Sequence, residues 1–132
     1  MIFVDASALL AILTHEDDAD DLADRLEADP DRLCSALSVW ETTVGLCRIH
    51  GLSVAAAQEH IDRFLAEADV RYVVIGEREC EIAADAFARF GKGRHRAALN
   101  MGDCFAYACA RSNNALLLFK GNDFVWTDIA AA

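Results

Sequence analysis

The sequence predicts an α/β protein: a three-layer α/β/α sandwich with a mostly parallel central sheet. Short, nearly continuous apolar runs alternate along the chain with longer amphipathic stretches. Strands without polar alternation are typical of parallel sheets that helices cover on both faces, because both sides of each strand are buried. The chain has 132 residues and no Ser/Gly-rich linker. We therefore expect one domain, residues 1–132.

Four apolar runs are the predicted strands, at 2–4, 33–36, 72–75 and 116–119. The spacing of apolar residues between and after them predicts helices. These helices cover 8–13, 16–29, 38–50, 54–68, 77–90 and 102–113. Ser38 and Glu41 have the spacing of a capping box, which predicts that Ser38 caps the third helix. Gly51 is placed to end it, and Ser53 to cap the next.

The charge balance excludes a protein that wraps nucleic acid by bulk attraction, because Lys+Arg is 12, Asp+Glu is 22 and the net charge is −10. A local basic patch is not excluded. The five cysteines form no Cys-x-x-Cys pair and no zinc-type spacing. We expect them to be free, mostly buried thiols in a reducing cytoplasm. No signal peptide and no membrane-spanning segment is expected.

Four acidic residues are placed near the carboxyl ends of the predicted strands. They are Asp5, Glu41, Asp103 and Asp123. In parallel α/β sheets the functional crevice lies beyond these strand ends. Four carboxylates gathered there would repel one another and bind a divalent cation such as Mg²⁺ or Mn²⁺. Taken singly, each acid also has a structural explanation as a helix cap, a dipole partner or a turn residue.

Four segments resemble the successive motifs of PIN-domain ribonucleases, and more narrowly those of the VapC toxins of bacterial toxin–antitoxin pairs. The segments are 1–9 (MIFVDASAL), 38–41 (SVWE), 99–108 (LNMGDCFAYA) and 117–124 (LLFKGNDF). Their order and spacing and the chain length all match the family. The resemblance covers essentially the whole chain.

The resemblance implies a Mg²⁺- or Mn²⁺-dependent endoribonuclease, a homodimer, held inactive by a cognate VapB-type antitoxin. Its acidic site falls on Asp5, Glu41, Asp103 and Asp123. Its hydroxyl position, which orients the acids, falls on Ser7. We expect Asp5 and Asp103 to be the metal ligands. Many relatives carry another Asp two residues before the equivalent of Asp123, where this chain has Gly121.

A basic segment, 89–96 (RFGKGRHR), runs directly into the Asp103 motif. We expect Lys92, Arg94 and Arg96 to hold RNA phosphates near the metal. The alternative is a solvated loop between two helices. Residues 16–31 hold nine acids and one base and are interpreted as a solvated helix face, which would also steer a basic antitoxin segment.

The main alternative function is a catalytically inactive PIN-like module that binds protein and holds no metal; Gly121 is the argument for it. A phospho-accepting receiver domain is disfavoured because Asp5 has no adjacent acid. Ser7 is interpreted as a hydrogen-bond donor to a carboxylate and not as a nucleophile. Trp40 and Trp126 are expected in the core or at an interface.

Overall fold

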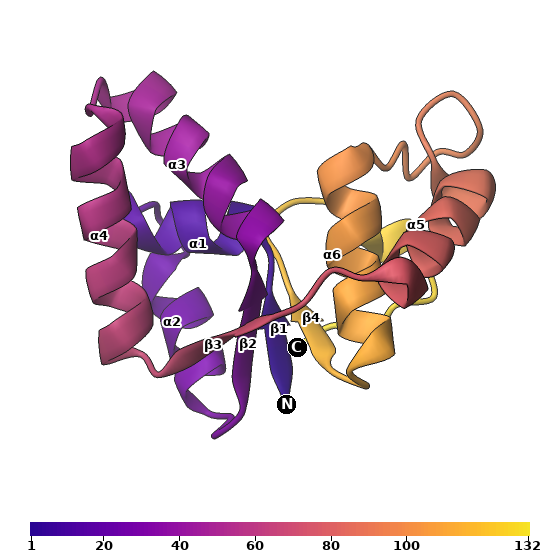
Figure 1. Ribbon diagram of the computed structural model, residues 1–132, viewed down its shortest axis with the longest axis horizontal. Coiled ribbons are helices and arrows are strands. Elements are labelled where there is room, and N and C mark those ends of the chain that lie inside the picture. Colours follow the sequence, from indigo (N-terminus) through magenta and orange to yellow (C-terminus); the bar gives the residue numbers. More distant parts are fainter.

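The computed structural model describes residues 1–132 and has a four-stranded, fully parallel sheet at its centre. The strands lie in the order β3-β2-β1-β4 (Figure 1). They are β1 (Ile2–Val4), β2 (Arg32–Ser35), β3 (Val70–Val73) and β4 (Leu116–Leu118). Phe3 of β1 pairs with Leu33 on one side and Leu117 on the other. The carboxyl ends of all four strands therefore meet at one edge.

Helices cover both faces of the sheet, which confirms the predicted three layers (Figure 1). One face carries α1 (Ala6–Leu13), α2 (Ala19–Glu27), α3 (Ala36–His50) and α4 (Val54–Glu67). The other carries α5 (Glu77–Phe90) and α6 (Met101–Ser112). A short 3₁₀ helix, η1 (Phe124–Trp126), follows β4. None of these helices is both long enough and apolar enough to cross a membrane.

The two faces of the sheet contribute to two separate cores. Ile2 and Val4 pack with the α1–α4 layer, whereas Phe3 between them packs with α5 and α6. In β2, Cys34 faces the first core and Leu33 the second. Successive side chains of a strand point to opposite faces. Both faces are covered at β1 and β4, so neither alternate position is polar there, which explains their continuous apolar runs.

The start of α3 differs from the prediction. The helix begins at Ala36, and its N-cap is Ser35, whose hydroxyl accepts a hydrogen bond from the backbone N–H of Ser38 at 3.1 Å. Ser35 ends β2 in the extended conformation that an N-cap needs. The predicted Ser38 cap is therefore wrong, and Glu41 lies in the second turn of α3.

Other boundaries follow the sequence more closely. Gly51 ends α3 with a φ of 63°, and the Ser53 hydroxyl caps α4 through the Ala56 N–H. The third strand, β3, lies two residues earlier than predicted, and Val74 beyond it is 82% exposed. All five cysteines are free, and three of them are buried.

Candidate functional site

Asp5 is the most deeply buried acid of the molecule, at 5% exposure. It follows β1, caps α1, and donates its backbone N–H to the Leu118 carbonyl of β4 at 2.9 Å. Its Oδ2 accepts hydrogen bonds from the Ser7 backbone N–H at 2.9 Å and the Ser7 hydroxyl at 2.5 Å. Burial raises the pKa of Asp5, although the bonds from Ser7 oppose the rise. The carboxylate is thus fixed in orientation at the sheet edge.

Ser7 joins two parts of the site. Its hydroxyl donates to Asp5 and accepts from the backbone N–H of Lys120 at 3.0 Å. Lys120 follows β4, three residues before Asp123, so one hydroxyl holds the Asp5 carboxylate against the segment that carries Asp123. The expected hydrogen bond from Ser7 to a carboxylate is therefore present.

Asp103 is held at the first turn of α6 by a capping box. The Asp103 N–H donates to Asn100 Oδ1 at 2.9 Å, and the Asn100 N–H donates to Asp103 Oδ2 at 2.9 Å. Between them, Gly102 lies against Glu41: a Cβ on Gly102 would be 2.5 Å from the Glu41 Cδ. The start of α6 therefore brings the carboxylates of α3 and α6 together. Gly102 and Asn100 are not among the predicted site residues, although a glycine and a capping residue beside Asp103 are a signal that the sequence contains.

The acids lie close enough together for neighbouring carboxylates to add to the rise that burial causes in the pKa values of Asp5, Glu41 and Asp103. Burial, with added repulsion from Asp5 and Asp103, raises the pKa of Glu41 to about 7. Burial raises the pKa of Asp103 to about 6, with added repulsion from Asp5 and Asp123. The structure therefore gathers these four acids at the carboxyl edge of the sheet. Their roles as catalytic groups and metal ligands stay a prediction.

No cation of the protein neutralises this pocket. Lys120 is close in the chain, but its ammonium group binds Glu16 and Asp18 just before α2.

Asp123 is exposed and lies directly before η1. Gly121 makes the turn after β4 with a φ of 96°, in the region that favours glycine.

The donor set suits a hard divalent cation. No three His, Cys, Asp or Glu side chains lie in an arrangement that would hold a metal ion by themselves. Mg²⁺ needs less, because it is usually bound by one or two carboxylates and keeps several waters. The pocket offers only oxygen donors and an excess of negative charge, which fits Mg²⁺ or Mn²⁺.

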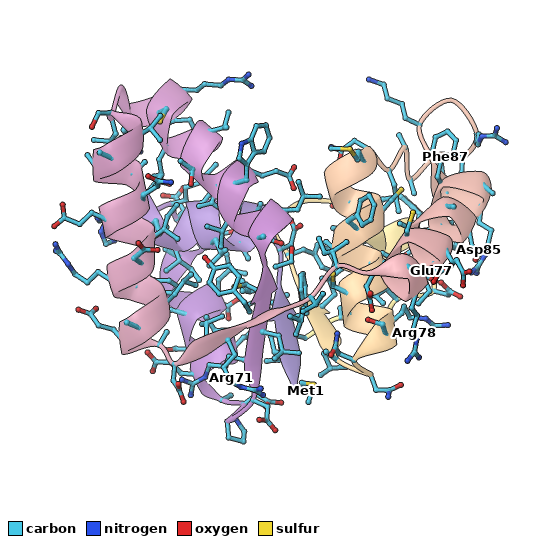
Figure 2. All side chains as sticks on the ribbon, in the orientation of Figure 1. Met1, Arg71, Glu77, Arg78, Asp85 and Phe87 are labelled. Atoms are coloured by element: carbon cyan, nitrogen blue, oxygen red, sulfur yellow. The ribbon has the colours of Figure 1, made fainter.

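The basic segment forms a closed loop between α5 and α6. The Lys92 N–H donates to the Leu99 carbonyl at 3.0 Å, and the Arg94 N–H donates to the Gly91 carbonyl at 2.9 Å. The side chains of Lys92, Arg94 and Arg96 are exposed. Arg94 lies 4.9 Å above the ring of Phe87, near the end of α5 beside the loop (Figure 2). Their contact with RNA stays a prediction.

The two tryptophans are exposed, Trp40 at 61% and Trp126 at 47%, so neither lies in the core, and the expected alternative of an interface position stays a prediction. Trp126 instead lies under Arg96, whose guanidinium carbon is 3.7 Å from the ring centroid. Exposure of a large aromatic ring leaves it available to a partner or ligand.

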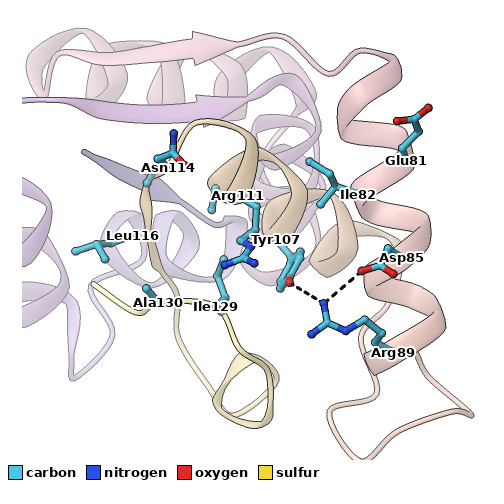
Figure 3. Close-up of a pocket in the computed structure, with 12 residues that line it drawn as sticks. Glu81, Ile82, Asp85, Arg89, Tyr107, Arg111, Asn114, Leu116, Ile129 and Ala130 are labelled. Carbon is cyan, nitrogen blue, oxygen red and sulfur yellow. Dashed lines mark hydrogen bonds and ion pairs between the residues drawn. The ribbon is translucent and has the colours of Figure 1, made fainter.

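A groove of about 780 Å³ lies on the far side of α6, among α5, the start of β4 and the C-terminal segment (Figure 3). None of the four clustered acids lines it. Two residues that line it bind the C-terminal segment: Arg89 donates to Asp128 at 2.7 Å, and the Tyr107 hydroxyl donates to Asp128 at 2.8 Å. This groove therefore fixes the C-terminal segment and is separate from the acidic pocket.

Comparison with known proteins identifies the family. The model of the PIN domain matches residues 2–129, so the chain belongs to the PIN-domain family. It is 42% identical over 128 residues to Ribonuclease VapC of Mycolicibacterium smegmatis, covering 97% of each chain. It is 41% identical over 127 residues to Ribonuclease VapC30 of Mycobacterium tuberculosis, covering 96% of this chain and 95% of that one. Within the PIN domains, the chain is thus of the VapC type.

A solved structure has the same fold. The crystal structure of Mycobacterium tuberculosis VapC20, described as a sarcin–ricin loop cleaving toxin, superposes with a TM-score of 0.77 at 22% identity. The match covers 100% of this chain and 98% of that chain. The likeness supports the PIN fold of the present structure from end to end.

Proposed function

We propose that this chain is a metal-dependent endoribonuclease that acts as the toxin of a toxin–antitoxin pair by cleaving RNA phosphodiester bonds. One observation carries the proposal: four neighbouring carboxylates gather at the sheet edge of a VapC-type PIN domain, and burial together with repulsion among them raises the pKa values of Glu41 and Asp103. Relatives that are about 40% identical over nearly their whole length are named ribonucleases. An inactive binding module would not need a pocket that raises the pKa of its own acids.

In this proposal Asp5 and Asp103 hold Mg²⁺ or Mn²⁺. The bound ion would supply charge stabilisation at the phosphate and a more acidic water. Ser7 orients Asp5 through its two hydrogen bonds. Glu41 lies beside both proposed ligands and is not itself assigned to the ion, which suits a general base at its carboxylate oxygens. Asp123 completes the negative wall of the pocket.

The RNA strand would be held by local cations, because the protein as a whole has a net charge of −10. Lys92, Arg94 and Arg96 are exposed on the loop that leads into α6 and Asp103. Contacts of this kind position the backbone without reading its sequence.

We also propose a homodimer in the cytoplasm and a VapB-type antitoxin as partner. The VapC-type family supports the antitoxin. Exposed apolar side chains of α3 and β3, among them Trp40 and Tyr72, offer a surface for protein contact. An antitoxin arginine would pair bidentately with the pocket carboxylates, which lack a cation of their own.

The test is cleavage of labelled RNA by the purified protein in Mg²⁺, in Mn²⁺ and in EDTA, with DNA of the same sequence as a control. Ribosomal and transfer RNA are offered together, so that either target is present. We expect metal-dependent RNA products, no products in EDTA, and intact DNA. Folded protein that cuts none of these RNAs in either metal would favour the binding module, and undiminished cutting in EDTA would exclude the metal mechanism.

A further inference from the structure

The stack of Arg96 on Trp126 is the closest contact between an arginine and an aromatic ring in the molecule. The guanidinium carbon is 3.7 Å from the indole centroid, which is van der Waals contact. Both side chains are exposed. Arg96 takes part in none of the ion pairs, whereas Arg89 and Arg63 are bound to carboxylates. Its N–H donors are therefore available to an anion.

Trp126 is held from both sides. Phe124, at the start of η1, is 2% exposed, and its ring centroid is 5.0 Å from that of Phe119. After the turn, Asp128 is bound by Arg89 and Tyr107, both labelled in Figure 3. An exposed indole between two such anchors is a rigid surface, so little conformational entropy is lost when a ligand binds to it.

Arg96 is presented by an equally fixed backbone. The His95 N–H donates to the Gly91 carbonyl at 3.1 Å, and the Ala97 N–H donates to His95 Nδ1 at 3.1 Å. Ala97, the next residue, is 2% exposed. These bonds fix the loop backbone that carries Arg96, whose guanidinium lies over the indole.

The stack joins two segments that each carry an acid of the pocket, Asp103 after Arg96 and Asp123 before Trp126. Asp123 directly precedes η1 and repels both Asp5 and Asp103. Trp126 is three residues further along this turn, which corresponds to roughly 6 Å of rise in a 3₁₀ helix. A nucleotide on the stack would thus neighbour the carboxylates.

We propose that Arg96 and Trp126 together hold one nucleotide of single-stranded RNA beside the acidic pocket and so position the strand for cleavage. The base stacks on the planar surface of the pair, and the free guanidinium donors bind a phosphate. This inference rests on the proposed ribonuclease function and adds to it a specific positioning pair. It assigns Arg96 a stacking role that Lys92 cannot share.

The competing explanation is a staple, in which the stack only joins the basic loop to the C-terminal turn. A staple contributes to the free energy of unfolding and leaves RNA affinity unchanged. A nucleotide platform contributes to RNA affinity even where the stability of the protein is unchanged. RNA bound to it also changes the fluorescence of the indole. The two explanations therefore differ in what they predict for binding.

The chain has only two tryptophans, which makes the indole directly observable. In an Asp103→Asn background that preserves the RNA, Trp40→Phe leaves Trp126 as the sole tryptophan, and Trp126→Phe leaves Trp40. We expect a short single-stranded RNA to quench the fluorescence of the first protein and not of the second. Arg96→Ala and Trp126→Ala should each weaken RNA binding, measured by anisotropy of the labelled RNA, by roughly fivefold to a hundredfold.

Arg63→Ala is the matched control, because it removes an exposed arginine from α4, away from the proposed RNA surface. Bound RNA with unquenched Trp126, or an unchanged affinity for both alanine variants beside a lower melting temperature, would overturn the platform and leave the staple. A quenched Trp126 in a protein whose wild type cuts no RNA would instead overturn the proposed function and keep the binding site. Arg96→Lys, which keeps the charge and loses the plane, should recover little of the affinity.

Discussion

The backbone of Gly102 lies against the carboxylate of Glu41, so closely that a Cβ at position 102 would come 2.5 Å from the Glu41 Cδ. Real side-chain carbons do not approach a carboxylate carbon to this distance. The contact explains how a residue in the second turn of α3 reaches Asp103 at the start of α6. It makes Gly102 a steric requirement of the acidic pocket.

Gly102→Ala should displace the Glu41 carboxylate and lower RNA cleavage by at least about tenfold, which corresponds to 1.4 kcal/mol of barrier. The fold should survive, because alanine is a better helix former than glycine. Gly76→Ala is the control, since its nearest contact is an ordinary 3.4 Å to Glu79 Oε2. Single-turnover rates of RNA cleavage test this prediction. A wild-type rate for Gly102→Ala would contradict the assigned role of Glu41.

The raised pKa values predict how stability depends on pH in the absence of metal. Glu41 and Asp103 titrate at about 7 and 6 in the folded protein, against ordinary values of 4.5 and 3.8. Between these limits the folded protein binds more protons than the unfolded chain. The free energy of unfolding contributed by these groups therefore falls as pH rises from about 4 to 7.

Melting temperatures in EDTA at pH 5 and pH 8 check this dependence. Glu41→Gln should be more stable than wild type at pH 8 and close to it at pH 5, because the amide cannot ionise. Added Mn²⁺ should raise the melting temperature of the wild type more at pH 8 than at pH 5. Parallel pH curves for the two proteins would show that Glu41 does not carry a raised pKa.

Expression of the wild-type chain alone should arrest bacterial growth if it is the toxin of a pair. Co-expression with an adjacent VapB-type gene should restore growth, and Asp5→Asn should be harmless by itself. Growth curves with parallel measurement of soluble protein test this expectation. A soluble, abundant wild-type protein that leaves growth unchanged would favour the inactive binding module.

The basic loop should account for much of the salt dependence of RNA binding. Replacing Lys92, Arg94 and Arg96 by alanine should flatten the slope of log affinity against log salt by about 0.7 for each lost phosphate contact on a single strand. Metal binding should be unchanged, because none of the three is a proposed ligand. Superimposable salt curves would place the RNA elsewhere on the protein.

The fold class and the positions of the acids follow from local sequence, whereas their exact approach does not. Asp5 was placed correctly because it directly follows β1, whose position is fixed by the apolar run. The start of α3 was misplaced because Ser35 and Ser38 both suit an N-cap, and only the end of β2 decides between them. The hydrophobic pattern predicts the layers of the fold. The boundaries of helices and strands are harder to predict, because neighbouring polar residues suit the same capping position.

Contacts between distant parts of the chain were not predictable from any local pattern. Gly102 meets Glu41, and Arg96 meets Trp126, only because α3, α6 and η1 converge at the same edge of the sheet. The exposure of Trp126 likewise follows from the anchoring of Phe124 and Asp128 on either side. Such pairings depend on the packed fold.

Cleavage of RNA by the gathered carboxylates is tested most directly by the RNA cleavage rate of Asp5→Asn and Asp103→Asn at saturating Mn²⁺. Each change keeps side-chain size and removes one charge. Asp20→Asn, an exposed acid of α2, is the control. The account predicts a fall of at least about a hundredfold for the two pocket variants and a wild-type rate for the control. Wild-type rates for both pocket variants would contradict it.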